Sequence, residues 1–389
     1  MTEKTRVLVV GGGYAGVLAA NRLRRDEQLE ITMINPRPSF VERIRLHQLV
    51  TGTDDATVDY EEVLGRGIIL VVDSVTKIDA AARRVELAAG DARDYDYLVY
   101  AVGSTGAGWT VPGAVEHAHS VAEHEQAVRL RAAVAGMPDG APICVVGSGP
   151  TGLETAAELA EAGRSVTLIC GGVLAPSLST GARRSVRRRL ARCGVDVVDG
   201  PGSTVAEVLA DAVLMTDGRR LPSAVTVWTA GFGVPDLATR SGLTTDAMGR
   251  LLTDETLTSV DDPRIVAAGD ASAPSGRPLR MSCQAAIPLG AQAADTVLTR
   301  VAGIEPRPID QAFTGQCISL GRRSGLIQLA HRDDRVVPLH VAGRAGATIK
   351  EMVCRSTISF LAREARKPGS YVWLKGGKRR QRLSELVAS

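Results

Sequence analysis

The chain has 389 residues, of which 44% are apolar and 23% are charged, and its formal net charge is +3. This length predicts two or three domains, because a single hydrophobic core rarely serves more than about 300 residues. No apolar run approaches the ~18 residues of a membrane-spanning helix, and a strand is expected where a secretory signal would lie. These features exclude an integral membrane protein of the helical class and predict a cytoplasmic protein.

The first predicted elements form a strand–helix–strand unit. Residues 6–10 and 31–34 have the β-branched composition of strands, and they flank a helix expected from about Tyr14 to Arg25. The same order returns later, with its strands and helix expected at 143–147, at about 150–162 and at 165–169. Each unit is followed by a small β-insert and then by a strand that ends in alanine and glycine. The chain therefore uses one architecture twice.

We expect an α/β fold with two Rossmann-like domains of three-layer ββα architecture and a small C-terminal α+β segment. The first domain is predicted to be discontinuous, because a strand at 263–272 and a helix from about Cys283 to Thr299 follow the second unit. The predicted boundaries are 1–115 with 238–303, then 116–237, and finally 304–389 with a basic tail.

The first unit contains Gly11-x-Gly13-x-x-Gly16 between its strand and its helix. In a dinucleotide cradle the first glycine makes the tight turn, the second lets the pyrophosphate approach, and the third lets helix and strand pack closely. The residue expected to face a ribose at the end of the second strand is Asn35, which can form hydrogen bonds without a charge.

The second unit contains Gly147-x-Gly149-x-x-Gly152, followed by Glu154. An acidic residue at the end of its second strand would favour NAD over NADP, but Cys170 stands there, so both cofactors stay open. Arginines at 183–189 lie near enough in sequence to meet a 2′-phosphate. The alternative for these arginines is a solvated helix face.

A third motif, Gly269-Asp270, lies in a turn at a strand end, where its carboxylate can accept hydrogen bonds from ribityl hydroxyls. The three motifs, in this order, resemble the two-dinucleotide-binding-domain flavoproteins of the pyridine nucleotide-disulfide reductase superfamily. The resemblance covers residues 6–300 and implies FAD on the first cradle and NAD(P)H on the second. It implies FAD contacts for Gly11, Gly13, Tyr14, Ala15, Gly16, Asn35, Arg43, Val72, Ala101, Gly103, Gly269, Asp270 and Gln284. It implies NAD(P)H contacts for Gly147, Gly149, Pro150, Thr151, Gly152, Glu154, Cys170 and Gly231.

The stretch at 35–52 indicates the branch of this superfamily. Disulfide reductases carry redox-active cysteines there, whereas this stretch has none, which argues against such thiol chemistry. It is similar instead to type II NADH dehydrogenases and to ferroptosis-suppressor and apoptosis-inducing-factor-like quinone reductases. The chain departs from the type II enzymes at Pro288 and Leu289, where they have a Gln-Gln pair near the quinone. In the C-terminal segment, 321–328 and Lys367 to Tyr371 resemble the ferroptosis-suppressor type.

The resemblance implies roles for two charged side chains. Glu154 is expected beside the nicotinamide, with a helix-start carboxylate favoured by the helix dipole as the alternative. Lys367 is expected to donate a proton or to stabilise reduced flavin, with an ordinary surface lysine as the alternative. His47 is expected to be a packing residue. No metal site is expected, because the six cysteines form no C-x-x-C motif or cluster at metal-ligand spacing.

The leading functional hypothesis is an FAD-dependent oxidoreductase that takes a hydride from NAD(P)H and passes electrons to a quinone or a similar small acceptor. The alternatives are a reductase of a redox protein such as ferredoxin and a slow-turnover, redox-sensing flavoprotein. The segment from Arg366 to Arg382 has seven basic residues and no acidic one. It is either a solvated tail or a contact with the inner face of an anionic membrane. No nucleic-acid partner is expected, and a homodimer is left open.

Overall fold

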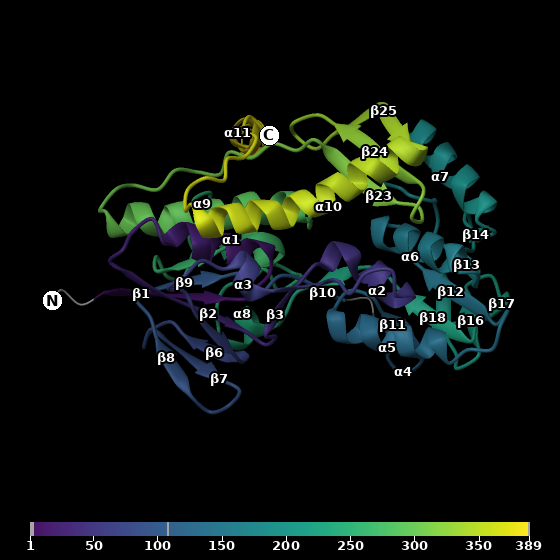
Figure 1. The fold of residues 1–389 in the computed structure, drawn as a ribbon, viewed down its shortest axis with the longest axis horizontal. Coiled ribbons are helices and arrows are strands. Elements are labelled where there is room, and N and C mark those ends of the chain that lie inside the picture. The colour runs from purple at the N-terminus through teal and green to yellow at the C-terminus, as the bar shows by residue number, and fades with distance from the viewer. Residues whose placement is uncertain (1–3, 107–108, 388–389) are drawn as a thin grey trace.

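The computed structural model describes residues 4–106 and 109–387 of the chain (Figure 1). Two α/β halves lie side by side, and a C-terminal segment covers both. The α/β class and the Rossmann-like architecture expected from the sequence are confirmed. None of the helices in the described part of the chain combines the length and the hydropathy that a membrane span requires.

The first half is built on a parallel five-stranded sheet of order β21-β9-β1-β2-β5. Its strands are β1 (Thr5–Val10), β2 (Leu29–Asn35), β5 (Ile69–Val72), β9 (Tyr97–Tyr100) and β21 (Ile265–Ala267). Helices α1 (Tyr14–Leu23) and α9 (Cys283–Val301) pack together in the core on one face. An antiparallel insert covers the other face with β6 (Val75–Asp79), β7 (Arg84–Leu87) and β8 (Ala92–Asp94).

The second half repeats this plan with a parallel sheet of order β11-β18-β12-β13-β14. Its strands are β11 (Ala118–Ser120), β12 (Pro142–Val146), β13 (Ser165–Ile169), β14 (Asp196–Val198) and β18 (Val225–Trp228). Helices α5 (His124–Ala135), α6 (Pro150–Glu161) and α7 (Thr180–Arg192) share its main core. The opposite face carries β15 (Val205–Val208), β16 (Ala212–Met215) and β17 (Arg220–Pro222).

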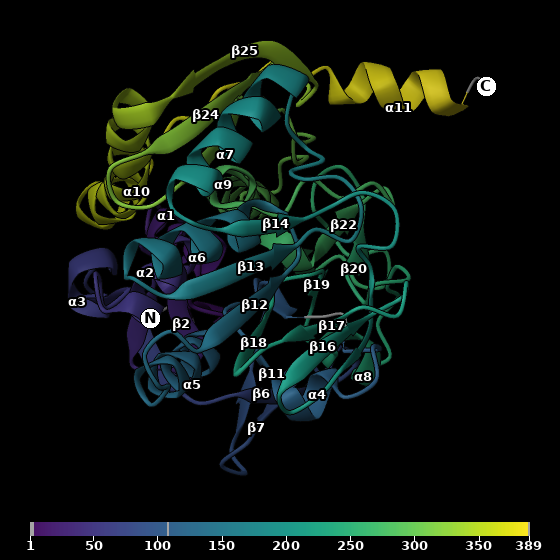
Figure 2. The same cartoon turned by 90° about the vertical axis from the view of Figure 1, so that its right-hand side faces the viewer.

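The C-terminal segment contains the antiparallel strands β23 (Gly315–Ser319), β24 (Gly325–Ala330) and β25 (Val336–Ala342), followed by α10 (Gly343–Arg366) and α11 (Arg379–Val387). Helix α10 packs on β23 and β24 at one end and on α1 at the other, so it lies across both halves. Figure 2, in which α11 projects away from the body, shows α10 beside α1.

Shorter elements connect these layers. They are β3 (Ser39–Val41), the 3-10 turn η1 (Arg43–Arg45), α2 (Leu46–Thr51), β4 (Thr57–Asp59), α3 (Tyr60–Val63), β10 (Thr105–Gly106), α4 (Ala114–His117), β19 (Phe232–Gly233), α8 (Leu237–Arg240), β20 (Leu251–Thr253), the 3-10 turn η2 (Gly269–Ala271) and β22 (Ser272–Pro274). The antiparallel pair β10–β19 links the two halves.

The basic tail is tied to the body of the protein. Tyr371 and Trp373 stack on each other with ring centroids 6.3 Å apart, and the guanidinium of Arg22 lies over the Trp373 ring. Arg379 forms an ion pair with Glu255 at 2.7 Å. The aromatic side chains of the tail therefore pack against the first half.

Candidate active site

The turn between β1 and α1 has the geometry of a phosphate cradle. Gly11 has φ +105°, and a side chain there would collide with the carbonyl oxygen of Ala101. Gly16 packs against the backbone of Gly11 in the same way. Gly13 differs, because its φ of −82° is ordinary and a Cβ added to it would meet nothing within 4 Å. The open space in front of Gly13, at the start of α1, is where a pyrophosphate would approach.

Asn35 is placed at the end of β2, where it stabilises this turn. Its Oδ1 accepts a hydrogen bond from the Gly12 amide at 2.9 Å, and its Nδ2 donates to the Arg37 carbonyl at 2.9 Å. Val72 pairs with Asn35 in the neighbouring strand and is half exposed. The Asn35 side-chain oxygen, which is predicted to contact a ribose, therefore already accepts a hydrogen bond from the backbone of the cradle.

Tyr14 and Ala15 begin the helix that follows the turn. The Tyr14 ring meets Phe40 edge-on with centroids 5.0 Å apart. Its hydroxyl is buried, and this burial raises the pKa of Tyr14 well above the usual value. Ala15 is buried where α1 meets α9, close to Gly290.

Three polar side chains from distant segments meet near the first cradle. Arg43 donates to Ser104 Oγ at 2.8 Å, and Ser104 Oγ donates to Asp270 Oδ2 at 2.6 Å. Asp270 Oδ1 is buried without a hydrogen-bond partner among the described residues. The structure therefore brings the predicted residues Arg43 and Asp270 together through Ser104, which sequence reasoning missed.

The other predicted residues of this half line the same region. Ala101 follows β9 and covers Gly11, while Gly103 and Gly269 adopt left-handed backbone conformations with φ +73° and +78°. Gln284 lies at the start of α9, where its Nε2 donates to Thr314 Oγ1 at 2.6 Å. Its Oε1 is buried without a partner among the described atoms, so one acceptor is free for a ligand.

The second cradle repeats the geometry of the first. Gly147 has φ +109°, Gly152 packs against its backbone, and a Cβ on Gly149 would again meet nothing within 4 Å. Thr229 Oγ1 donates to the Val146 carbonyl at 2.8 Å and closes the turn from β18. This role of Thr229 could not be predicted from the residues around it.

The predicted NAD(P)H contacts surround this turn. Pro150 and Thr151 start α6, and Gly231 follows β18 with φ +89°. Cys170 is buried at the end of β13, where desolvation raises its pKa to about 11, so it is a neutral thiol. All six cysteines of the chain are free thiols.

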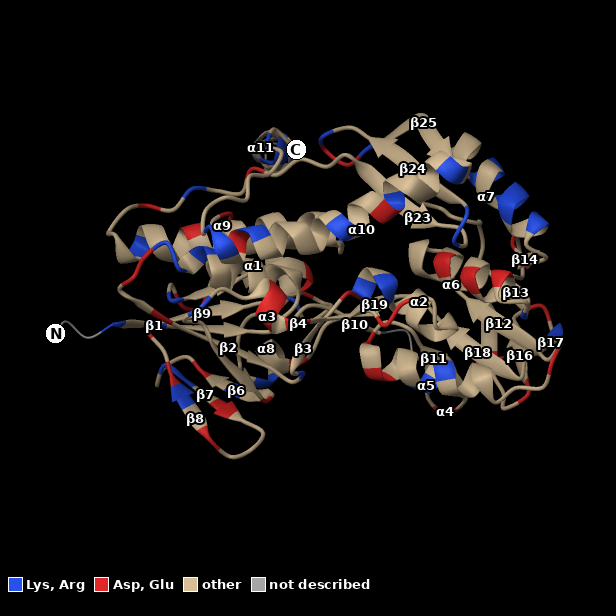
Figure 3. Ribbon diagram, in the orientation of Figure 1, with Lys and Arg blue, Asp and Glu red and all other residues tan. Residues whose placement is uncertain are grey.

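Glu154 is the centre of a buried polar cluster between α6, α2 and α10. Its Oε1 accepts from Lys350 Nζ at 2.9 Å and from the Ser319 amide at 2.9 Å. Its Oε2 lies 3.7 Å from His47 Nδ1. Figure 3 shows acidic bands on α6 on the side that faces the C-terminal segment.

The charge states in this cluster follow from burial and from mutual attraction. Desolvation opposes charge on both Glu154 and Lys350, but their attraction keeps the pKa of Glu154 below its usual range and raises that of Lys350. Desolvation lowers the pKa of His47 to about 4, so this imidazole is neutral at pH 7. The cluster is therefore a carboxylate–ammonium pair with a neutral histidine beside it.

Lys350 belongs to this buried cluster, and sequence reasoning missed it. Lys367, the predicted one, is exposed just past the end of α10. The two lysines are separated by about 25 Å of helix at 1.5 Å per residue. A partial signal for Lys350 did exist, because its helical spacing places it in the buried stripe of α10 with Gly346, Cys354 and Leu361, although this spacing does not reveal its partner.

A cavity of about 350 Å³ opens beside the pair. Its lining includes Gln48, Ser319, Arg322, Lys350 and Glu351. The ammonium of Lys350 therefore lies between a buried carboxylate and a polar cavity.

The residues present fit two dinucleotides. Each half has a glycine turn with open space before a helix, and the first half adds the unpartnered acceptor Asp270 Oδ1. Gly11, Gly13, Gly16 and Asp270 would hold FAD, and Gly147, Gly149 and Gly152 would hold NAD(P)H.

Comparisons with known proteins agree with this geometry. The family model of pyridine nucleotide-disulphide oxidoreductases matches residues 5–290. A NADH dehydrogenase-like protein of Mycobacterium tuberculosis is 31% identical over 326 residues, which cover 76% of this chain and 80% of that protein. A type II NADH:quinone oxidoreductase of Staphylococcus epidermidis is 26% identical, with 90% and 94% covered. In fold, the sulfide:quinone oxidoreductase of Aquifex aeolicus is similar with a TM-score of 0.77 at 18% identity, covering 94% of this chain and 93% of that one.

The family match covers more than half of the chain, and it includes both cradles, Glu154 and Asp270. That family consists of flavin-dependent enzymes that use NAD(P)H. The chain belongs to the pyridine nucleotide-disulphide oxidoreductase family and is an NAD(P)H-dependent oxidoreductase.

Proposed function

We propose that the chain passes a hydride from NAD(P)H to FAD and then electrons to a quinone or a similar small acceptor. The observation that carries the proposal is the buried pair of Glu154 and Lys350 at the second cradle. The similarity to a protein named as a type II NADH:quinone oxidoreductase supports the quinone as acceptor.

The first cradle and Asp270 would bind FAD, and the second cradle would bring NAD(P)H to it. When bound, FAD accepts the hydride and passes electrons on, so that the protein supplies binding, orientation and electrostatics. Arg43 holds Ser104, and Ser104 in turn holds one oxygen of Asp270, which leaves the other oxygen to accept a ligand hydroxyl.

Lys350 would act as a fixed positive charge. Its raised pKa keeps the ammonium protonated across the physiological pH range. The ammonium would therefore stabilise negative charge that develops on the electron acceptor. Glu154 keeps the ammonium in place, and the neutral His47 packs against the carboxylate without competing for it. Burial makes this electrostatic effect stronger than it would be in water.

The decisive variant is Lys350→Met, and its control is Lys367→Met, just past the C-terminal end of the same helix. We expect Lys350→Met to lower kcat with a soluble quinone by about 100-fold, as loss of one charge-stabilising donor typically does. Lys367→Met should stay within about twofold of the parent, because its side chain is in solvent. The reverse ranking of the two variants would overturn the assignment of Lys350.

A second experiment tests the reaction itself. Flavin-loaded protein is mixed with NADH or NADPH, and reoxidation is followed with quinones, a ferredoxin and air. Reoxidation fastest with quinone supports the proposal, whereas a preference for ferredoxin or for air overturns it. The ratio of kcat/KM for NADH and NADPH then decides whether the site around Cys170 accommodates a 2′-phosphate.

The variant Glu154→Gln tests the position of Glu154. An unchanged rate of flavin reduction together with an unchanged NAD(P)H affinity would show that Glu154 is not part of the NAD(P)H site.

A further inference from the structure

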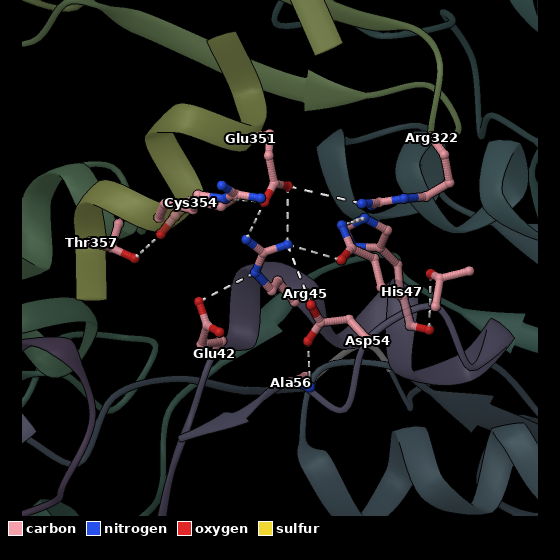
Figure 4. A network of polar contacts seen from close by, with 12 residues as sticks. Glu42, Arg45, His47, Asp54, Ala56, Arg322, Glu351, Cys354 and Thr357 are labelled. Carbon is pink, nitrogen blue, oxygen red and sulfur yellow. Dashed lines mark hydrogen bonds and ion pairs between the residues drawn. The ribbon is translucent and has the colours of Figure 1, made fainter. Parts of the chain in front are cut away.

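Arg45 is the centre of a buried polar network between η1, α2 and α10 (Figure 4). Only 6% of its side chain is exposed. Its guanidinium forms a two-pronged contact with Glu351, with Nη2–Oε1 at 3.0 Å and Nη1–Oε2 at 3.2 Å. It also donates to Glu42 Oε2 at 3.3 Å and to Gln48 Oε1 at 3.1 Å, and it lies 3.5 Å from Asp54 Oδ2.

The partners of Arg45 are direct neighbours of the site residues. Gln48 follows His47 in α2, and Glu351 follows Lys350 in α10. Lys350 pairs with one carboxylate oxygen of Glu154, and His47 lies near the other. Arg45 therefore joins the two helices that carry the partners of Glu154, and it does so one residue away from each partner.

The network is strongly charged, and the positions of its carboxylates depend on the guanidinium of Arg45. Glu42, Asp54 and Glu351 place three carboxylates around this one buried guanidinium. The hydrogen bonds from Arg45 are the main reason why the pKa of Glu351 falls to about 2. A planar guanidinium can meet several acceptors at fixed angles, whereas an ammonium acts as a single point charge.

Two other arginines reach Glu351 from more exposed positions. Arg355 contacts it at 2.9 Å along α10 and Arg322 at 3.9 Å, with 77% and 39% of their side chains exposed. Arg355 lies on the same helix as Glu351, so it cannot fix α10 against α2. Arg45 is thus the buried member of this group that connects the segment after the first cradle to the C-terminal helix.

We propose that Arg45 is a positioning residue that fixes α10 against α2 and thereby holds Lys350 on Glu154. This inference rests on the proposed function of the Glu154–Lys350 pair. Gln48 and Glu351 also line the cavity beside Lys350, so a shift of α10 would change that cavity as well. Arg45 does not touch the reacting groups and acts through Lys350.

The test compares Arg45→Met with Arg250→Met in the full-length, flavin-loaded protein. Arg250 is a suitable control because it is also mostly buried and ion-paired, with Asp246 at 2.7 Å, and lies outside the network. We expect Arg45→Met to lower kcat about tenfold or more, since small displacements of a catalytic group have effects of this size. The KM for NAD(P)H should change less than twofold, and Arg250→Met should leave both values near those of the parent.

Two further variants separate positioning from folding. Arg45→Lys keeps the charge without the planar fork and should recover only part of kcat, and Glu351→Gln should lower kcat in the same direction as Arg45→Met. Arg45→Met combined with Lys350→Met should be no slower than Lys350→Met alone, because Arg45 acts through Lys350. Unfolding temperature and flavin content are measured for every variant. If Arg45→Met does not fold, Arg45→Lys and Glu351→Gln carry the test.

The outcomes distinguish this inference from the proposed function. Unchanged turnover in Lys350→Met would overturn the role of the pair and the inference with it. Loss of turnover in Lys350→Met with parental kcat in folded Arg45→Met and Glu351→Gln would overturn the inference alone. A further loss in the double variant would show that Arg45 acts by another route and would also overturn it.

Discussion

Glu158 lies one turn after Glu154 in α6 and is buried, with 2% of the residue exposed. Its Oε1 accepts from Thr53 Oγ1 at 2.8 Å, while its Oε2 has no partner among the described atoms. Desolvation raises the pKa of this carboxyl, and the hydrogen bond from Thr53 and the charge of Arg322 only partly oppose the effect. Two carboxyls on the same helix therefore differ, because Glu154 has a buried ammonium and Glu158 does not.

The raised pKa of Glu158 predicts that the charged form of this carboxyl destabilises the fold. A carboxyl whose pKa is higher in the folded state stabilises the fold at a pH below its unfolded pKa of about 4.3, and this stabilisation is lost as the pH rises through the folded pKa. Glu158→Gln removes the charge and keeps the acceptor for Thr53. We expect its unfolding temperature to match the parent near pH 4 and to exceed it by about 2 °C at pH 8.

Thermal unfolding of both proteins from pH 4 to pH 8 checks this expectation. Glu116→Gln is the control, because Glu116 is exposed in α4. A Glu158→Gln variant that is less stable than the parent at pH 8 would show that the charged form of Glu158 is favoured in the fold.

At the scale of elements, the two cradles contain glycines of two kinds. Gly11 and Gly147 have positive φ values and face backbone atoms, so a side chain strains the turn itself. Gly13 and Gly149 have ordinary φ values of −82° and −69° and face open space. A methyl group at these two positions is compatible with the fold but fills the space that a pyrophosphate needs.

Alanine substitutions should therefore separate ligand binding from folding. We expect Gly13→Ala to fold with a parental unfolding temperature in the absence of flavin and to lose FAD. We expect Gly149→Ala to keep FAD and to raise the KM for NAD(P)H about tenfold or more, since the nucleotide approaches the backbone there.

Flavin absorbance per chain and steady-state kinetics measure these effects. Gly11→Ala and Gly147→Ala serve as the comparison, and both should lower the yield of folded protein. Full flavin content in Gly13→Ala would contradict the assignment of the first cradle.

The elements also indicate how much the sequence could predict. The helices expected to start at Tyr14, Pro150 and Cys283 do start there, because glycine turns and apolar periodicity act within a short window of residues. The hydrogen bonds of Ser104 and the pairing of Lys350 with Glu154 could not be found in this way. Both depend on segments far away in the chain, and although the spacing along α10 indicates that Lys350 is buried, no local feature reveals its partner.

At the scale of the whole molecule, one buried carboxylate joins the tail to the first half. Glu364 near the end of α10 is fully buried, and it accepts hydrogen bonds from the amides of Gly369 and Tyr371, both at 2.6 Å. Arg22 of α1 lies 3.4 Å from the same carboxylate. A single side chain therefore accepts hydrogen bonds from two amides of the chain reversal after α10.

Glu364→Ala should release this reversal. The change leaves two backbone amides without their acceptor and removes one of the two carboxylates beside Arg22, which keeps Asp295 at 2.7 Å. Loss of one partner of a buried pair costs about 3 kcal/mol. We expect the free energy of unfolding to fall by about that amount, with faster hydrogen exchange at the Gly369 and Tyr371 amides.

Denaturant unfolding and hydrogen exchange measure the two effects, with the exposed Glu61→Ala as control. If exchange at these amides stayed slow in Glu364→Ala, the tail would be held by other contacts, such as the stacking of Tyr371 and Trp373.

Helix α10 carries Lys350 toward one half and Glu364 toward the other, on a single rod of about 36 Å. One continuous helix carries both contacts, so the anchoring of the tail and the position of the Lys350 ammonium share a single structural support. Truncation of the C-terminal segment before α10 would remove the helix that packs on both halves and the ammonium paired with Glu154 in one step, so this segment is not an interchangeable appendage of the two dinucleotide-binding halves.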